Sequence, residues 1–197
     1  MGRLIGRAPG QVKWPCRGRL GRCAGVVPRY PAGTSGHPFT IRPARPGEVP
    51  ALSSLCLRSK AHWGYDAAFL AASRAALTVD PGRVAEGRVD VAEEDGRVLG
   101  VVAMDAGSDA QTGEVALMFV DPAAIGLGLG RALLTHALTR AAARGARRAL
   151  VVSAPGARGF YERMGARFVG VAPSDAIPGR SLPRLEIALQ VSPAGSA

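Results

Sequence analysis

The stretch from Val115 to His136 constrains the fold of this 197-residue chain more than any other. It opens with a continuous apolar run, Val115–Val120, which predicts a buried strand. Asp121-Pro122 ends that strand, because proline cannot donate to a ladder. Ile125-Gly-Leu-Gly-Leu-Gly130 follows, and then one apolar helix face: Leu133, Leu134, Ala137, Leu138 and Ala141. A strand, a glycine loop and a helix N-terminus gather free N–H groups and a positive dipole end, which predicts a phosphate site.

Two common nucleotide-binding motifs do not fit this loop. A Rossmann fingerprint would place its third glycine at position 131, where the chain has Arg131. It would also need an acid about 20 residues further on to bind a ribose, where the chain reads Ala-Leu-Val-Val. A P-loop ends in Gly-Lys-Ser/Thr, whereas Gly130 is followed by Arg131-Ala132. The loop is therefore expected to hold the phosphates of another kind of ligand.

The loop resembles the pyrophosphate loop of the GCN5-related N-acetyltransferase (GNAT) family. The family pattern Gln/Arg-x-x-Gly-x-Gly/Ala matches Ile125, Gly126, Leu127, Gly128, Leu129 and Gly130. The lead-in Phe119–Pro122 and a downstream segment, Phe160–Phe168, also match family elements in the right order. Two ordered motifs are more specific than either alone. The resemblance extends over residues 38–191.

The rest of the chain predicts a mixed α/β fold. Helices are expected from Pro46 to about His62, over 67–77, after the glycine loop, and over 155–165, whereas Asp80-Pro-Gly is read as a turn. Strands are expected at 39–42, 89–93, 98–104, 115–120, 149–153, 167–171 and 184–191. This order favours one mixed sheet with helices on both faces. It agrees with the acyl-CoA N-acyltransferase fold that the resemblance implies, with a mostly antiparallel sheet of about seven strands.

Charge divides the chain into a tail and a domain. Through Arg45 there are nine basic residues and no acid, whereas sixteen Lys and Arg face fifteen Asp and Glu from Pro46 onward. Residues 1–37 are rich in Gly, Arg and Pro and are expected to be a disordered basic tail, 38–191 the N-acetyltransferase domain, and 192–197 a short disordered C-terminus. The tail is read as a basic arm, an Arg-rich organellar presequence or residues upstream of the natural start, with the third favoured. The net charge of +10 describes the tail, so no nucleic acid is expected as a partner.

The cysteines and apolar runs predict the compartment. Cys16, Cys23 and Cys56 show neither metal-ligand spacing nor a C-x-x-C pair, so we expect no metal and a reducing, cytoplasmic location. The first 30 residues show no secretory apolar segment, and no run is long enough to span a membrane, so no membrane partner is expected.

The resemblance implies that acetyl-CoA is the acyl donor and an amine the acceptor. It assigns the pyrophosphate to backbone N–H groups of Leu127–Arg131, and the pantetheine arm and carbonyl to the backbone of Phe119 and Val120. Tyr161 matches the family tyrosine that lies near the CoA sulfur and can donate a proton to it. The alternative for Tyr161 is a core aromatic residue with its hydroxyl at the rim.

Glu114 is the preferred general base, because it precedes the central strand near the expected meeting point of amine and thioester. His62 is the rival base, since its ordinary pKa suits proton transfer. With Trp63 and Tyr65 it forms an aromatic loop in a region that usually walls the acceptor pocket of this fold. A packing plug at a helix turn is the alternative for the two aromatic residues.

Two departures from the family pattern favour a second hypothesis. Ile125 replaces the usual Gln/Arg, with Arg131 as a candidate substitute, and Gly156 stands where many relatives carry Asn. A catalytically degenerate CoA-binding or sensor module is therefore the alternative to the enzyme, and nucleic-acid binding through the tail is a weaker one. The loops at 58–80 and 172–183 show no charged cluster that selects a substrate class. Small-molecule and peptide amines, and a homodimer, are left open.

Overall fold

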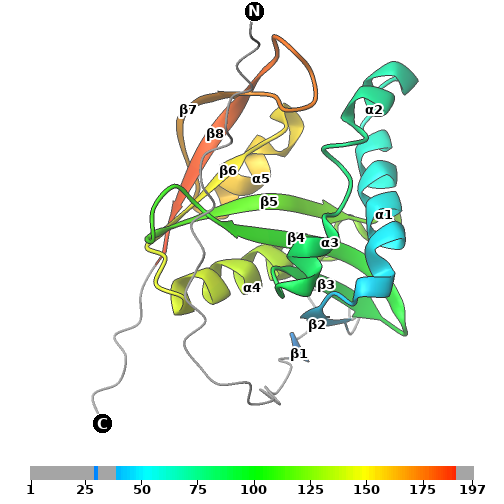
Figure 1. The fold of residues 1–197 in the computed structure, drawn as a ribbon, viewed down its shortest axis with the longest axis horizontal. Coiled ribbons are helices and arrows are strands. Elements are labelled where there is room, and N and C mark those ends of the chain that lie inside the picture. Colours follow the sequence, from blue (N-terminus) through cyan, green and yellow to red (C-terminus); the bar gives the residue numbers. More distant parts are fainter. Residues whose placement is uncertain (1–28, 31–38, 190–197) are drawn as a thin grey trace, which may run out of the picture.

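The computed structural model describes residues 29–30 and 39–189, which form one twisted sheet with helices on both faces (Figure 1). The strands are β1 (Arg29–Tyr30), β2 (Phe39–Pro43), β3 (Val89–Glu94), β4 (Arg97–Ala106), β5 (Thr112–Val120), β6 (Arg148–Val152), β7 (Arg167–Pro173) and β8 (Ser181–Ala188). They lie in the order β1-β2-β3-β4-β5-β6-β8-β7. Of the pairings between these strands, β5 with β6 is parallel and the others are antiparallel. The seven expected strands are confirmed, and the two-residue β1 is added at the edge.

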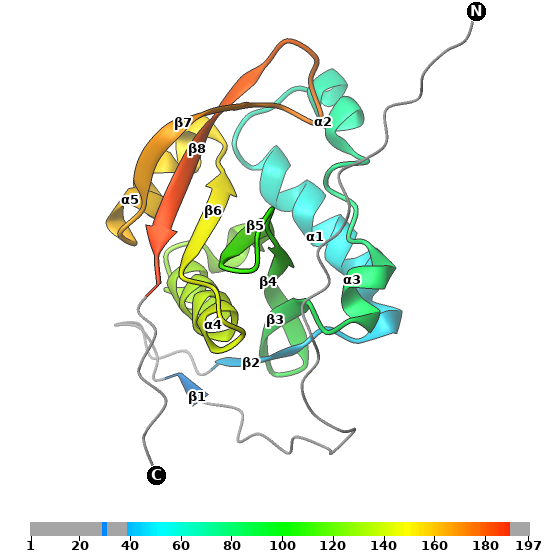
Figure 2. The same cartoon turned by 60° about the vertical axis from the view of Figure 1, so that its left-hand side comes forward.

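The helices lie on opposite faces of the sheet. They are α1 (Val49–Ala61), α2 (Ala67–Ser73), α3 (Pro81–Ala85), α4 (Leu129–Ala143) and α5 (Arg158–Arg163), with 3-10 turns at Pro46–Glu48, Pro122–Ala124 and Pro155–Ala157. The core between α1, α3 and the sheet contains Leu52, Leu55, Val84 and Val101. On the other face α4 packs onto β2–β5 through Leu129 and Leu133, and α5 joins it through Tyr161. Figure 2 shows α4 and α1 separated by the sheet.

Three boundaries differ from the sequence prediction. Asp80 does not make a simple turn but accepts a hydrogen bond from the Gly82 N–H (2.8 Å) and caps α3, whose Val84 is buried. The helix expected over 67–77 ends at Ser73 and continues as turns. β5 begins at Thr112 rather than Val115, because pairing with β6 starts at Thr112 and pairing with β4 at Gly113. Glu114 therefore lies inside the strand, not before it.

The predicted tails lie almost entirely outside the described residues. Of the segment 1–37 only Arg29–Tyr30 is described, and it pairs with β2 through Arg29↔Thr40 and Tyr30↔Phe39. The segment 192–197 lies beyond the last described residue.

Candidate active site

The two parallel strands at the centre of the sheet separate before they end. Pairing of β5 with β6 stops at Val115↔Val151, although β5 continues to Val120. On its other edge β5 stays paired with β4, where Ala103 faces Leu117 and Met104 faces Val115. Ala116 is thus an extra residue, a β-bulge, at the point where the strands part. Within the part of the chain described, the backbone beyond the bulge has no strand partner on the β6 side.

A cleft of about 1400 Å³ follows this opening. It is lined by the end of β5, the glycine loop, the end of β6, the start of α5, the α1–α2 connection and the loop between β7 and β8. The sequence-predicted residues on its walls are Glu114, Phe119, Val120, Ile125, Gly126, Gly128, Leu129, Gly130, Arg131, Tyr161, Trp63 and Tyr65. Leu127 and His62 are not lining residues; His62 is exposed at the end of α1.

The glycine loop presents unpaired N–H groups to the cleft. Gly126 (φ 90°) and Gly128 (φ 83°) adopt the left-handed conformation, and α4 begins directly after Gly128. The N–H of Ala132 is the first of the helix to bond backward, to the Gly128 carbonyl (3.1 Å). The three N–H groups before it have no acceptor among the described residues. Because these groups and the helix dipole point to one place, the loop fits a pyrophosphate.

Two side chains of this region lie exposed at the cleft. Ile125 is 40% exposed and supplies no polar contact. Arg131, in the first turn of α4, is exposed and forms no ion pair with any described residue. Its guanidinium is therefore available to a phosphate, which supports its assignment as the substitute for the missing polar residue at 125.

Asp121 anchors the turn between β5 and the glycine loop. Its buried carboxylate accepts hydrogen bonds from the Ala123 N–H (3.1 Å) and from Arg58 Nη2 on α1 (2.9 Å). Burial by itself raises the pKa of Asp121, but these hydrogen bonds outweigh it and hold that pKa below its ordinary value. Arg58 and Asp121 thus link α1 to the start of the loop.

The Tyr161 side chain is almost fully buried, and its hydroxyl makes only a weak hydrogen bond. The residue is 7% exposed on α5, and its hydroxyl donates to the Met118 thioether at 3.7 Å. Burial raises the pKa of Tyr161 to about 12. The hydroxyl therefore keeps its proton at neutral pH, and a thioether is a weak acceptor that a better one can replace.

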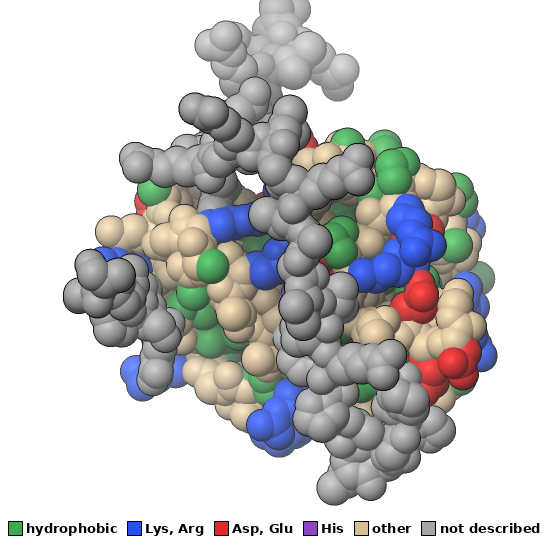
Figure 3. Space-filling model, turned by 90° about the horizontal axis from the view of Figure 1, so that it is seen from below, with side chains coloured by type: hydrophobic (Ala, Val, Ile, Leu, Met, Phe, Trp, Pro, Cys, Tyr) green, Lys and Arg blue, Asp and Glu red, His purple; other side chains and the backbone are tan. Residues whose placement is uncertain are grey.

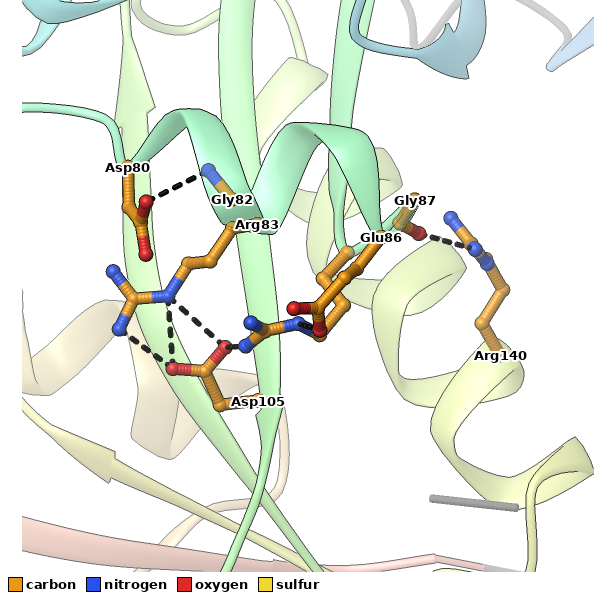
Figure 4. Close-up of polar contacts among 8 residues, drawn as sticks. Asp80, Gly82, Arg83, Glu86, Gly87, Asp105 and Arg140 are labelled. Carbon is orange, nitrogen blue, oxygen red and sulfur yellow. Dashed lines mark hydrogen bonds and ion pairs between the residues drawn. The ribbon is translucent and has the colours of Figure 1, made fainter. Parts of the chain in front are cut away.

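Two carboxylates lie side by side on β4 and β5, in different surroundings. Asp105 faces Glu114 across the strand pair. Arg83 of α3 binds Asp105 through two nitrogens (2.7–3.0 Å), and Arg88 binds it as well (Figure 4). Among the described residues the one ion-pair partner of Glu114 is Arg184 Nη2, at 3.9 Å, and the Glu114 side chain is 45% exposed. Of the two, Glu114 has oxygens free to accept a proton.

A sequence model of the acetyltransferase (GNAT) family matches residues 58–166, more than half of the chain. The chain belongs to this family. A comparison with curated protein sequences gives no match.

Solved structures share the GNAT fold. The chain is 24% identical to N-acetylglutamate synthase from Neisseria gonorrhoeae, complexed with coenzyme A and N-acetyl-glutamate, with a TM-score of 0.57 over 77% of this chain and 35% of that one. It is 24% identical to yncA, a putative acetyltransferase from Salmonella typhimurium with acetyl-CoA (TM-score 0.56; 81% and 98%). It is 14% identical to the paia N-acetyltransferase from Thermoplasma acidophilum in complex with coenzyme A (TM-score 0.61; 76% and 98%). The chain thus spans about a third of the synthase and nearly all of the other two.

One pair of charges at the wall of the cleft was not expected from the sequence. The loops at 58–80 and 172–183 do bring like charges together: Lys60 and Arg180 lie over the rings of Tyr65 and Phe69. No local signal in the sequence could reveal this cluster, because its two cations come from opposite ends of the domain. Trp63, 61% exposed, lies at the same wall, in edge contact with His62.

The face of the GNAT domain seen in Figure 3 carries dispersed charge. In the view of Figure 3, Lys and Arg side chains are spread among apolar and neutral ones, and acidic side chains lie beside the basic ones at the right. Across residues 29–30 and 39–189, no helix has the length and apolar character needed to cross a membrane. In the same residues no group of three His, Cys, Asp or Glu side chains is arranged to hold a metal ion.

Proposed function

We propose that this chain transfers the acetyl group of acetyl-CoA to an amine. The observation that carries the proposal is the continuity of one cleft from the free N–H groups before Ala132, along the separated end of β5, to Glu114 and Tyr161. Each part suits one requirement of thioester aminolysis: an anion site, exposed backbone beside the acyl group, a proton acceptor and a proton donor.

The donor is bound and oriented by backbone groups. N–H groups at the start of α4, with Arg131, hold the pyrophosphate. The backbone of Phe119 and Val120, at the end of β5 that has lost its β6 neighbour, takes the pantetheine arm. Because these groups belong to the end of a central strand and the first turn of a helix packed on the sheet, their geometry is fixed before binding. The reaction then gains from positioning without the cost of ordering a mobile loop.

Proton movement is assigned to two side chains. Glu114 accepts the proton of the amine, directly or through water, as nitrogen forms its bond to the thioester carbon. The C–S bond breaks, and the Tyr161 hydroxyl gives its proton to the departing thiolate. Asp105 cannot serve as the base in place of Glu114, because two arginines occupy its oxygens.

The test is the release of free thiol from acetyl-CoA in the presence of amine panels, with the acetylated product identified by mass spectrometry. Turnover with at least one class of amine and an N-acetyl product is expected. Binding of CoA without turnover across amino acids, polyamines, aminoglycosides and peptides would favour the degenerate CoA-binding or sensor module instead. A cytoplasmic location and a homodimer stay predictions from the sequence.

A further inference from the structure

Two cations from distant segments lie over one pair of stacked rings in the cleft. Tyr65 and Phe69 stack with centroids 4.3 Å apart and planes 14° from parallel. Lys60 Nζ, at the end of α1, is 4.7 Å from the Tyr65 centroid, and Arg180 Cζ is 4.9 Å from the Phe69 centroid. All four side chains line the cleft. We call them the aromatic–cation cluster; cation–π attraction gives each charge a defined place in it.

The two positive charges of the cluster have no negative partner in the described part of the chain. Neither Lys60 nor Arg180 forms an ion pair there, and Asp175, on the same loop as Arg180, lines the cleft without pairing to either. Burial is the largest cause and lowers the pKa of Lys60; Tyr65 opposes it, and the charge of Arg180 adds a smaller lowering effect. The site therefore holds two like charges at close range, a repulsion that a bound anion would remove.

The loop that carries Arg180 is tied down rather than left open. The Ser174 N–H donates to the Arg180 carbonyl (2.8 Å), and the Arg180 N–H donates to the Ile177 carbonyl (3.2 Å). The Ser174 hydroxyl oxygen accepts from the N–H groups of Ala176 and Ile177. Figure 2 shows this loop reaching from β7 and β8 towards α2. The loop is thus ordered before any ligand binds. Ligand binding at Arg180 therefore does not carry the entropy cost of ordering this loop.

We propose that the acceptor amine carries a carboxylate, which Lys60 and Arg180 bind. The inference rests on the proposed acetyl transfer and names its substrate class. A guanidinium binds a carboxylate through two parallel hydrogen bonds, and an ammonium adds a third donor. Glu114 lines the same cleft, so the cleft holds both an anion site and a proton acceptor.

Matched acceptor pairs test the proposal. Leucine is compared with 3-methylbutylamine, and phenylalanine with 2-phenylethylamine, since each pair differs by one carboxylate. Arg180→Met and Lys60→Met should each lower kcat/KM for the amino acids by about tenfold, the range for losing hydrogen bonds to a charged group, and leave the plain amines unchanged. The basicity of each amine cancels, because variants are compared on the same substrate.

Controls separate charge from folding. Arg74→Met removes an exposed arginine that does not line the cleft and should change neither member of a pair. Arg180→Lys keeps the charge and should restore part of the amino-acid activity. Thermal melting of each variant checks that the fold persists. Equal loss for both members of a pair would overturn the proposal, since Arg180 would then only shape the cleft.

A binding arm distinguishes this proposal from the proposed function. Calorimetry measures leucine binding to the CoA-saturated protein, which should weaken in Arg180→Met and with rising salt. Turnover of plain amines without a carboxylate preference would overturn the inference and leave acetyl transfer intact. Absence of turnover with every amine would overturn acetyl transfer. In that case salt-sensitive leucine binding that is lost in Arg180→Met still supports the anion site, and absence of binding overturns it.

Discussion

Tyr161 keeps its proton and donates it only to a weak acceptor, so its hydroxyl can turn to a departing thiolate. With its pKa raised to about 12 by burial, the hydroxyl stays protonated across the working pH range. Tyr161→Phe keeps the ring against the α4–α5 core and removes the proton. We expect kcat to fall by roughly 10²-fold, as for a lost general acid, with little change in acetyl-CoA affinity or melting temperature. Steady-state kinetics measures kcat, and calorimetry measures the acetyl-CoA affinity. A kcat near the wild-type value would mean that Tyr161 serves only as an aromatic residue of the core.

Glu114 differs from its neighbour Asp105 in being free of a tight arginine clamp. Glu114→Gln keeps the size of the side chain and removes the proton acceptor. We expect a large fall in kcat near neutral pH and recovery as pH rises, because a larger share of the amine then arrives already deprotonated. The pH profile of kcat, with Tyr161→Phe as comparison, is the measurement. A mutant whose loss is the same at every pH would remove Glu114 from the proton path.

At the scale of elements, the junction of β5, the glycine loop and α4 depends on two left-handed glycines. Gly128→Val forces a branched side chain into φ 83° beside the unpaired N–H groups. We expect CoA affinity to fall at least about tenfold, or 1.4 kcal/mol. Gly145→Val is the matched control, since it strains a left-handed glycine (φ 99°) just past the other end of α4, away from the cleft. It should lower stability without weakening CoA binding; equal weakening in both variants would contradict the assignment.

A largely buried ion pair joins α4 to β3, beside their apolar contact. Arg140 binds Asp90, which is 4% exposed, and donates to the Gly87 carbonyl at 2.9 Å (Figure 4). Arg140→Met leaves the carboxylate facing only His136 Nε2 at 3.6 Å. We expect the free energy of unfolding to fall by ~3 kcal/mol, the cost of breaking a buried pair from one side. Urea denaturation measures it, and Asp90→Leu combined with Arg140→Met should recover much of the loss.

The elements were predictable where their signal is local. The apolar run Val115–Val120 forms a strand as expected, because its side-chain pattern is a local signal, but only Leu117 in it is fully buried. α3 was missed, since Asp80-Pro-Gly suits a turn and a helix start equally. The helix is stabilised by burial of Val84 and by the Arg83–Asp105 ion pair, which the local sequence does not reveal. The start of β5 at Thr112 was missed because pairing, not side-chain pattern, extends the strand.

At the scale of the whole molecule, the glycine-loop end of the cleft was predictable from the sequence and the end formed by the aromatic–cation cluster was not. The glycine loop is a continuous motif, so its free N–H groups follow from the sequence alone. The bulge at Ala116 and the partnership of Lys60 with Arg180 depend on how strands and loops from opposite ends of the domain meet. Only the assembled fold brings those groups together.

The early parting of β5 from β6 also bears on how the molecule folds and loosens. Strands β2–β5 form one antiparallel series and β6–β8 form another. The two series are joined in the sheet by the four residue pairs between β5 and β6. Pairing of β5 with β6 requires closure of the long connection through α4, so we expect this pairing to form late in folding. A donor that touches the α4 start on one side and α5 on the other bridges the two units. Its binding should therefore stabilise the native state by mass action and slow hydrogen exchange most at β6.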